Sequence, residues 1–498
     1  MATRLPLEFS FAGAGASRTP REPDAPLRLL LVADLGGDRA QPLAARRAVA
    51  VDIDRFDAVM ATVSPRVTLD LDGQALPLRL RTLDDFHPDA LFDQVSAFAA
   101  LRSLRDDARD ARQLGRVAAA LGLSNAAPVA APSAAPSAAP AATTDAGDDI
   151  ARLLGRPASA PVPAAPTAAG LLDTWLRGLV VLHVQADHAV EQQAVVAAID
   201  SALGALMRRV LHAPALQAVE AAWRAVDRLV RGLDLGETAQ LWLLDASRDE
   251  LLLDLQTNQA DLSGSVLHTQ LQRRGADDTG YGLLAVDHAF GPAAADVQAL
   301  AALGALGARA GVPVLANGTP GLVGAADAAG LTEPRRWLTE DDPALAAWEA
   351  LRTAPMAPWL GLVLPRVLMR LPYGPATDPV SRFAFDELAA GRADERYLWG
   401  GGAPALALLA GQAFQAAGWD WDLAQHLDLD DLPSHVVRVD GEAQQQPTAE
   451  VLMGETAARA LVDRGLMPLA SYAHRPAARL LGWQSVARPA TALRGLGG

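Results

Sequence analysis

The stretch Trp359-Leu-Gly-Leu-Val-Leu-Pro365-Arg366-Val-Leu-Met-Arg370-Leu-Pro372-Tyr373-Gly374 decides how this 498-residue chain is built. Its first six residues form a short apolar run, which is typical of a strand that is buried on both faces. Rigid and charged residues follow and give the strand a surface-type ending. The stretch contains no catalytic motif, so it indicates architecture and not a chemical reaction.

Two further regions near the N-terminus predict strands. The apolar run at residues 27–33 is closed by Asp34-Leu-Gly-Gly, which predicts a buried strand that enters a turn. Apolar and polar residues alternate at 67–71 and 76–80 on either side of Asp72-Gly73. This pattern predicts a hairpin, with Pro77 at a sheet edge or bulge.

Helical periodicity alternates with strand signals along the rest of the chain. A single amphipathic helix is expected after Asp89, because Leu91, Val95, Phe98 and Leu101 fall on one helical face. Two more helices are expected, one from residue 191 and one from Pro214. Strand candidates at 240–244, 283–286, 312–316 and 360–364 alternate with helical stretches such as 296–310. The alternation predicts an α/β fold with a largely buried sheet.

Residues 125–169 differ abruptly in composition from the rest of the chain. Prolines recur every four residues from Pro128 to Pro140 among alanine and serine, so this region cannot form a packed core. We interpret it as a flexible linker between a domain at 1–124 and a domain at 170–498. Residues 148–155 are the exception, since they could form one helical turn that acts as a docking motif.

Composition limits the classes of partner and chemistry. The net charge is −15 and the pI is near 5.0, which argues against binding to nucleic acid or to an anionic membrane surface. The absence of cysteine excludes disulfides and thiolate sites. No signal peptide opens the chain and no uncharged apolar stretch reaches membrane-spanning length, so we expect a cytoplasmic protein without membrane insertion.

Several motifs together resemble the contractile sheath of the bacterial type VI secretion system. The small-subunit signature is the run at 27–37 followed by Val51-Asp52-Ile-Asp54-Arg-Phe56-Asp57-Ala-Val59-Met60. The large-subunit signature includes the stretch at 359–374. Its other matching residues include His212, Pro214, Gln217, Glu220, Trp223, Arg224, Asp245, Glu250, Asp254, Tyr281, Asp287, Phe290, Asp296, Trp348, Arg352, Phe383, Phe385, Trp399, Trp419, Gly465 and Pro468. Because so many matches occur in order, the pattern is specific.

The resemblance implies a single-chain fusion of sheath-type halves. Residues 1–124 resemble the small subunit, and residues 170–498 resemble a large subunit without its C-terminal region. The family implies a sheath-protein fold of mixed sheets flanked by helices, with the two halves packed together. It also implies partners among sheath subunits, the inner tube protein or baseplate components, with self-association as a further option. We expect no cofactor and no enzymatic activity.

The resemblance leaves two versions of the structural function open. The linker occupies the place of the family's N-terminal extension, and the family continues beyond Trp483-Gln484-Ser485 with strands that exchange between neighbours. These departures favour, as an alternative to a contractile sheath subunit, a sheath-like accessory that caps, limits or adapts the sheath or baseplate. A third version, an α/β small-molecule enzyme, would require a polar cleft with perturbed carboxylates at the strand ends.

Candidate residues for structure and interfaces come from the same motifs. We expect Arg366 and Arg370 to pair with carboxylates inside the fold or at an interface, and Trp223 and Trp399 to be core residues. Pro372, Tyr373, Asp34, Asp54 and Phe56 complete the set of structural or interface candidates. Asp52, Asp54 and Asp57 lack the glycine and distal glutamate of a calcium loop, so neither these carboxylates nor those at 428–431 predict a metal site.

Overall fold

The computed structural model describes residues 7, 9–11, 24–39, 41–71, 73–110, 112–120, 192–274, 279–389, 396–439 and 442–496. The chain divides into two compact units. Unit 1 comprises Met1–Val95 and Met207–Gly498, and unit 2 comprises Ser96–Leu206. Unit 1 therefore combines residues from both ends of the sequence.

A nine-stranded mixed sheet forms the centre of unit 1, in the order β11-β15-β14-β8-β7-β6-β1-β5-β2. Six neighbouring strands, from β14 to β5, run parallel, and antiparallel strands complete both edges. The strands are β1 (Leu27–Ala33), β2 (Val49–Val51), β5 (Ala239–Asp245), β6 (Leu283–Phe290), β7 (Val314–Gly318), β8 (Leu360–Leu364), β11 (Asp428–Leu429), β14 (Met467–Ser471) and β15 (Ala478–Leu480).

Strand β1 lies inside this sheet although it comes from the start of the chain. It pairs in parallel with β5 along its full length, from Leu27 opposite Ala239 to Ala33 opposite Asp245. On its other side it pairs with β6, from Leu29 to Val32. All seven residues of β1 are buried, as expected for an apolar strand in a parallel sheet. Part of the small-subunit-like segment thus completes the sheet of the large-subunit-like segment.

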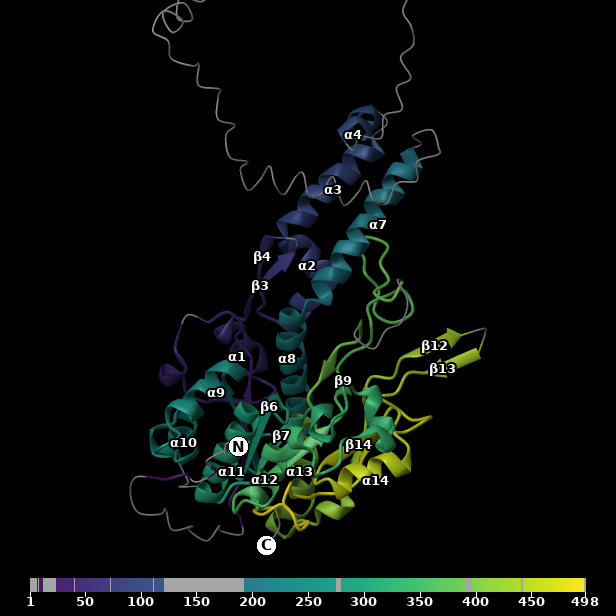
Figure 1. Cartoon of the computed structure of the whole chain (residues 1–498). Helices are drawn as coiled ribbons and strands as arrows, with labels where there is room; N and C mark the ends of the chain where they lie inside the picture. Colours follow the sequence, from purple (N-terminus) through teal and green to yellow (C-terminus); the bar gives the residue numbers. More distant parts are fainter. Residues whose placement is uncertain are drawn as a thin grey trace, which may run out of the picture. The chain divides into compact units, whose positions relative to one another are not determined.

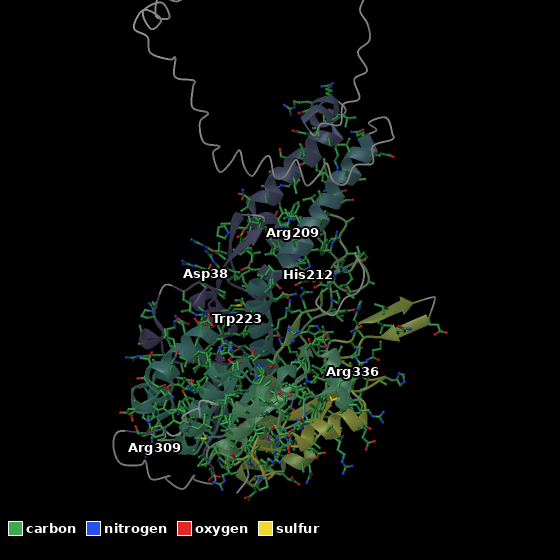
Figure 2. The ribbon with its side chains drawn as sticks, in the orientation of Figure 1. Asp38, Arg209, His212, Trp223, Arg309 and Arg336 are labelled. Atoms are coloured by element: carbon green, nitrogen blue, oxygen red, sulfur yellow. The ribbon has the colours of Figure 1, made fainter. Side chains whose placement is uncertain are left out.

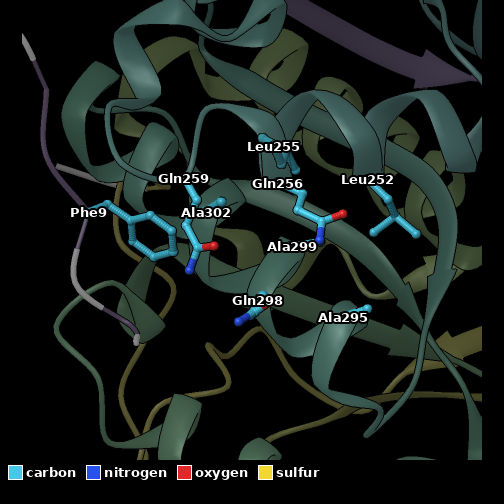
Figure 3. A pocket seen from close by; sticks show the side chains of 9 residues that line it. All are labelled: Phe9, Leu252, Leu255, Gln256, Gln259, Ala295, Gln298, Ala299 and Ala302. Atoms are coloured by element: carbon cyan, nitrogen blue, oxygen red, sulfur yellow. The ribbon is translucent and has the colours of Figure 1, made fainter. Parts of the chain in front are cut away.

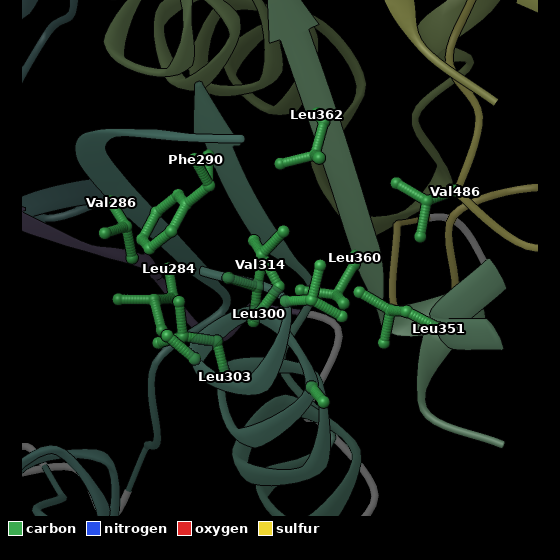
Figure 4. Close-up of a cluster of buried hydrophobic side chains, with 14 of the residues drawn as sticks. Leu284, Val286, Phe290, Leu300, Leu303, Val314, Leu351, Leu360, Leu362 and Val486 are labelled. Atoms are coloured by element: carbon green, nitrogen blue, oxygen red, sulfur yellow. The ribbon is translucent and has the colours of Figure 1, made fainter. Parts of the chain in front are cut away.

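Helices cover both faces of the sheet. Leu360, Leu362 and Leu364 of β8 belong to the core cluster that includes α11 (Ala294–Ala310), whereas a Cβ on Gly402 of α13 (Gly402–Ala417) would meet Val363. Because successive side chains of a strand point to opposite faces, α11 and α13 lie on opposite sides of the sheet. Figure 1 shows α11, α12 and α13 around the labelled strands, and Figure 4 shows leucines of α11 packed against β6, β7 and β8.

Smaller elements complete unit 1. The other helices with described bounds are α1 (Phe56–Val63), α2 (Pro88–Gln94), α8 (Pro214–Gly232), α9 (Arg248–Thr257), α10 (Val266–Leu271), α12 (Ala346–Arg352) and α14 (Glu455–Asp463). Three two-stranded sheets pair β3 (Arg66–Leu71) with β4 (Gln74–Arg79), β9 (Val367–Leu368) with β10 (Trp399–Gly400), and β12 (Val436–Val439) with β13 (Glu442–Gln445). None of the helices in the described ranges has the length and apolar character needed to cross a membrane.

Unit 2 is helical in its described parts. It contains α3 (Ser96–Arg109), α4 (Leu114–Ala120) and the first part of α7 (Gln192–Leu211), which continues into unit 1. The Nε atom of Arg105 lies 2.6 Å from an oxygen of Asp200, and Gln192 donates to the carbonyl of Ala108 at 3.1 Å. These contacts join residues on both sides of the proline-rich region.

The structure confirms the predicted α/β fold class, the strand at 27–33, the hairpin around Gly73 and the helix that begins at Pro214. The single helix expected after Asp89 is wrong, because α2 ends and α3 begins on either side of Val95. Val95 has an extended backbone, with φ −86° and ψ 121°, and remains buried. Two short helices therefore produce the burial pattern that one continuous helix would produce.

The predicted linker at 125–169 and the turn at 148–155 lie outside the described residues. The domain boundaries at 124 and 170 fall in the same region and remain predictions.

The position of β1 predicts that the two segments stay together after the connecting chain is cut. A specific protease site inserted between residues 130 and 140 should yield two fragments that co-elute in size-exclusion chromatography, because β1 is hydrogen-bonded on both sides to strands of the second fragment. Fragments that elute separately and remain folded would contradict this expectation. Separation should require denaturant.

Candidate functional site

A buried ion network lies around Arg370, in the loop that follows β9. We call it the Arg370 network, and its members are Glu220, Arg224, His212, Arg370, Tyr373 and Glu387. Arg370 Nε donates to Glu220 at 2.8 Å, and its two terminal nitrogens donate to the two oxygens of Glu387 at 2.8 and 3.1 Å. The fork geometry of guanidinium matches a carboxylate in this bidentate way. One arginine thus joins α8 to the segment that follows β9.

Arg224 and Tyr373 extend the network, while the second oxygen of Glu220 is buried and accepts no hydrogen bond from the described residues. Arg224 lies one turn after Glu220 on α8 and donates to it at 2.8 Å, and it also donates to the Tyr373 hydroxyl at 3.1 Å. The backbone nitrogen of Tyr373 donates to Glu387 at 2.8 Å, and the Arg370 guanidinium lies 4.1 Å from the centre of the Tyr373 ring. Two carboxylates and two guanidiniums therefore balance in charge within one cluster.

Burial decides the electrostatics of the Arg370 network. The side chains of Arg370, Glu220 and Glu387 are 6%, 0% and 1% exposed. Burial disfavours the charged carboxylate of Glu387, but the charge of Arg370 and hydrogen bonds from His212, Arg370 and Tyr373 outweigh it and lower the pKa to about 2. Burial also disfavours charged Arg370, and Glu220 and Glu387 outweigh it to raise its pKa. Each charge thus depends on its partners.

A second cluster lies at the carboxyl ends of β1 and β5. We call it the Arg39 cluster, and its members are Asp34, Arg39, Arg46, Asp245 and Glu250. Arg39 donates to both oxygens of Asp245, at 2.9 and 2.6 Å, and also pairs with Asp34. Arg46 donates to both oxygens of Glu250, at 2.8 and 2.5 Å. Arg39 and Arg46 come from the part of the chain before the proline-rich region, which we call the first segment. Asp245 and Glu250 come from the part after it, the second segment.

The backbone of the turn after β1 fits closely into the Arg39 cluster. The amides of Leu35 and Gly36 both donate to one oxygen of Asp245 at 2.9 Å. Gly37 has φ +62°, and a Cβ there would lie 2.1 Å from the carbonyl oxygen of Arg66, so only glycine fits this position. The glycines of Asp-Leu-Gly-Gly therefore allow the backbone of this turn to pack closely against Arg66 and Asp245, and we assign them no role in binding phosphate.

Electrostatics of the Arg39 cluster follow the same balance of burial and pairing. Burial raises the pKa of Glu250, but hydrogen bonds from Arg46 and Ser247 and the charges of Arg46 and Arg39 outweigh it and lower the pKa to about 2. Ser247 is also the N-cap of α9 and forms a capping box with Glu250. One glutamate thus begins a helix and binds the first segment.

Trp223 and Phe56 connect the same two segments through apolar contact. Trp223 on α8 is fully buried, its indole nitrogen donates to the carbonyl of Leu35 at 2.9 Å, and its ring meets Phe56 edge-on at 5.8 Å. Figure 2 labels Trp223 on α8 and His212, which lies between the end of α7 and the start of α8. The tryptophan therefore packs as a core residue and fixes the turn after β1.

The loop at 373–385 receives a further part of the first segment. Asp89 accepts from the backbone nitrogens of Ser381 and Arg382 at about 3.0 Å, and Phe92 stacks on Phe383 at 5.2 Å. Burial opposes ionisation of Asp89, but the hydrogen bonds from Ser381 and Arg382 lower its pKa. Residues of α2 thus bind the loop that carries Tyr373.

The other candidates from the sequence occupy separate places. Both arginines pair with carboxylates, as expected. Arg366 pairs with Glu450 at 2.5 Å but is 54% exposed, so of the two only Arg370 forms an ion pair that is shielded from water. Trp399 is buried with Leu368 in a small satellite cluster. Pro372 is buried beside Tyr373, and Asp54 is exposed just before α1. Of the nine candidates, Arg370 and Tyr373 belong to the Arg370 network and Pro372 lies between them in the sequence, whereas Trp223, Phe56 and Asp34 lie around the turn after β1.

Sequence reasoning named only part of these clusters. Glu220, Arg224, Asp245 and Glu250 match the family without an assigned role. The i,i+4 spacing of Glu220 and Arg224 and the capping box that contains Glu250 are local signals, whereas Asp245 has none. Glu387 and Arg39 carried no signal, because their partners are distant in the sequence. Arg39 and Asp245 are 206 residues apart.

One perturbed carboxylate lies within strand β6, outside both clusters. Burial raises the pKa of Asp287 on β6 to about 6, although Asn317 donates to it at 2.8 Å. Asn317 in turn accepts from the backbone nitrogen of Ala403 in α13 at 2.8 Å. A Cβ at Gly401 would lie 2.0 Å from Asp287, so the start of α13 packs directly on the carboxylate.

Acidic residues at 428–431 pair with arginine. Asp428 pairs with Arg479, and Asp430 pairs with Arg475. Across the described ranges, no group of three or more histidine or acidic residues is arranged to hold a metal ion.

Comparisons with known proteins match the two segments separately. Residues 193–487 match the VipB (EvpB) family, described as the tail sheath N-terminal domain. Residues 2–119 match the VipA family, described as part of the type VI secretion system.

Two Pseudomonas aeruginosa (strain PAO1) proteins are similar to this chain. The type VI secretion system sheath protein TssC1 is 28% identical over 329 residues, which cover 61% of this chain and 66% of the relative. The sheath protein TssB1 is 30% identical over 114 residues, which cover 21% of this chain and 64% of the relative. The chain thus spans just under two thirds of the length of each relative.

The difference in exposure between the two arginines predicts different costs of truncation. Arg370→Ala should lower the free energy of unfolding by about 3–5 kcal/mol, because it leaves Glu220 and Glu387 buried without their partner. Arg366→Ala is the matched control and should cost less than about 1 kcal/mol, because the Arg366 side chain is 54% exposed and water screens its ion pair. Denaturant unfolding measures both values, and equal costs would contradict the assignment.

The low pKa of Glu387 predicts an acid-sensitive contribution to stability. Because its folded pKa is about 2 and lies below the ordinary value of 4.5, its stabilisation is complete above about pH 5 and is lost as the pH falls through 2. The difference between the folded and the ordinary pKa of Glu387 corresponds to roughly 3 kcal/mol of unfolding free energy. Glu387→Gln should therefore reduce the dependence of the unfolding free energy on pH between 5 and 2.

The control for this measurement is Glu442→Gln, which removes the same charge from an exposed position in β13. It should leave the pH dependence close to that of the wild type. An unchanged slope in Glu387→Gln would show that Glu387 is not a major source of acid sensitivity.

Proposed function

We propose, since the chain belongs to the tail sheath family of the type VI secretion system, that it is a structural component of that system in which a small and a large sheath-type segment act as one subunit. The two family matches confirm that the first segment resembles a small sheath subunit and that the second segment resembles a large one. The observation that carries the proposal is the position of β1, because the first segment completes a sheet made by the second.

Joining the two segments in one chain has a direct physical advantage. Pairing of β1 with β5 and β6 becomes intramolecular, so it no longer depends on the concentration of a separate small subunit. The chain also enforces one small segment for each large one. This stoichiometry supports a role as a repeating or terminal unit of an assembly.

The charged residues of the two clusters, together with Asp287 on β6, support a structural role over a catalytic one. The Arg370 network and the Arg39 cluster pair guanidinium with carboxylate through short hydrogen bonds inside the protein. Asp287, the carboxylate with a raised pKa, is packed against the start of α13. These groups stabilise the fold, and we propose that the protein acts by assembly in the cytoplasm and not by catalysis.

The partners that we propose are other sheath subunits, with the inner tube protein and baseplate components as further candidates. Self-association is part of the same proposal. Both relatives are named as sheath proteins, which supports sheath subunits as the first partner to test.

An accessory role at the end of a sheath is the second candidate function. It is favoured by the outer strands of the large sheet, because β2 has three residues and β11 has two. Such short edges offer few backbone groups for adding a further strand. A subunit of this kind could bind a sheath end and limit growth there.

Electron microscopy distinguishes these candidates. If the accessory function holds, the purified protein alone should form particles or at most rings, and it should label the ends of tubes when mixed with cognate small and large sheath subunits. If it is an ordinary sheath subunit, the protein alone should form extended tubes or be incorporated along their whole length. Failure to bind any sheath or baseplate component would contradict both.

A further inference from the structure

One loop joins two members of the Arg370 network. We call residues 374–386, which run from Tyr373 to Glu387, the strap. The backbone nitrogen of Tyr373 donates to Glu387 Oε2 at 2.8 Å, and the backbone nitrogen of Glu387 donates to the carbonyl of Tyr373 at 2.9 Å. Because these two residues close the strap at its base, a displacement of the strap acts directly on the Arg370 network.

The strap has little support of its own. It contains no helix or strand, and its internal backbone hydrogen bonds, from Gly374 to Asp378 and from Thr377 to Gly374, close a single turn. Of residues 375–386, only Phe383 and Phe385 are buried. Segments with few buried apolar contacts open locally at a lower free energy than the core. The strap therefore depends on contacts that other elements supply.

One turn of α2, in the first segment, contacts the middle of the strap. Asp89 accepts from the backbone nitrogen and the hydroxyl of Ser381, at 3.0 and 2.7 Å, and from the backbone nitrogen of Arg382 at 3.0 Å. Phe92 lies three residues after Asp89 on the same face of α2 and stacks on Phe383, with 5.2 Å between the ring centres. The helix thus binds both the backbone of the strap and its buried ring.

Further contacts lie at the two ends of the strap. The ring of His87, which is the N-cap of α2, lies edge-on to the Tyr373 ring at 5.0 Å, and His87 Nε2 lies 3.6 Å from a carboxylate oxygen of Asp378. At the other end, Arg208 of α7 donates to the carbonyl of Asp386 at 3.1 Å. The first segment therefore contacts the strap near its start and at its middle, whereas the second segment binds its end.

The strap forms a wall of a hollow beside the Arg370 network. Thr377 and Asp378 line this hollow together with Arg224 and Arg370. Both guanidiniums are paired with carboxylates, and such pairs are much weaker when water surrounds them. Opening of the strap removes this wall and admits water to the paired charges.

We propose that α2 is a latch that keeps the strap closed over the Arg370 network, so that binding of α2 and closure of the network are coupled. When α2 is in place, Asp89 and Phe92 bind the strap, and Tyr373 and Glu387 stay paired at its base. When α2 is released, the strap opens locally while the central sheet stays folded. The latch lies within one chain and does not depend on the sheath function proposed above.

Hydrogen exchange of the full-length chain, read by mass spectrometry at single residues, tests the latch. Asp89→Ala should raise the exchange rates of the Ser381 and Arg382 amides about tenfold or more, because their acceptor is lost. The amides of Tyr373 and Glu387, which bond to each other and not to Asp89, should also exchange several-fold faster. This second effect is the specific one, because it reports coupling between the latch and the Arg370 network.

Two variants provide the matched controls. Asp93→Ala removes a carboxylate one turn farther along α2, which pairs with the exposed side chain of Arg382, and it should change these rates less than about threefold. Phe9→Ala removes a contact of the first segment at a different place, where Phe9 enters an apolar recess lined by residues of α9 and α11 (Figure 3). It should leave exchange in the strap unchanged.

Two outcomes for Asp89→Ala would overturn the latch. One is unchanged exchange at Tyr373 and Glu387, and the other is a uniform rise that includes β6 and β7, because it would mean that the variant only lowers global stability. If Asp89→Ala does not fold, Ser381→Ala tests the same contact from the strap, since it removes only the hydroxyl donor to Asp89. It should raise exchange at Tyr373 and Glu387 about twofold, and no change would overturn the proposal. None of these results depends on whether the protein binds sheath subunits.

Discussion

Parallel pairing of β1 between β5 and β6 is the constraint on which the rest of unit 1 depends. A central strand of a parallel sheet must have its backbone groups bonded on both sides and its side chains covered on both faces. Here the strand comes from the first segment, and both neighbours come from the second. Neither segment has a complete sheet without the other, so the interface between them is a part of the hydrophobic core.

The charged clusters make this interface specific. Apolar strands such as β1 can shift in register at little cost in hydrophobic contact, whereas Arg39 reaches both oxygens of Asp245 only in one register. The carbonyl of Leu35 adds a second restriction, because Trp223 donates to it. Buried ion pairs are weak evidence for net stability, but they strongly disfavour alternatives that leave a charge unpaired.

Local patterns in the sequence predicted most of the strands and helices but not which of them lie next to each other in the fold. The apolar run at 27–33 identified a buried strand, but nothing local showed that its partners begin at Ala239 and Leu283. Arg370 was recognised as a paired residue, yet its partner Glu220 is 150 residues away. The break at Val95 was missed because burial, and not helical continuity, determines the apolar spacing there. Pairing between distant segments depends on the whole fold, and therefore periodicity alone does not reveal it.

The order of synthesis gives the position of β1 a consequence for folding in the cell. Arg28 of β1 and Thr279, which it contacts just before β6, are 251 residues apart in the sequence. At translation rates of about 5–20 residues per second, β1 leaves the ribosome roughly 10–50 seconds before β6. For most of that interval, until β5 is synthesised, the apolar strand has no partner on either side, which exposes it to aggregation. Chaperone binding to the nascent N-terminal segment would protect it until the second segment is complete.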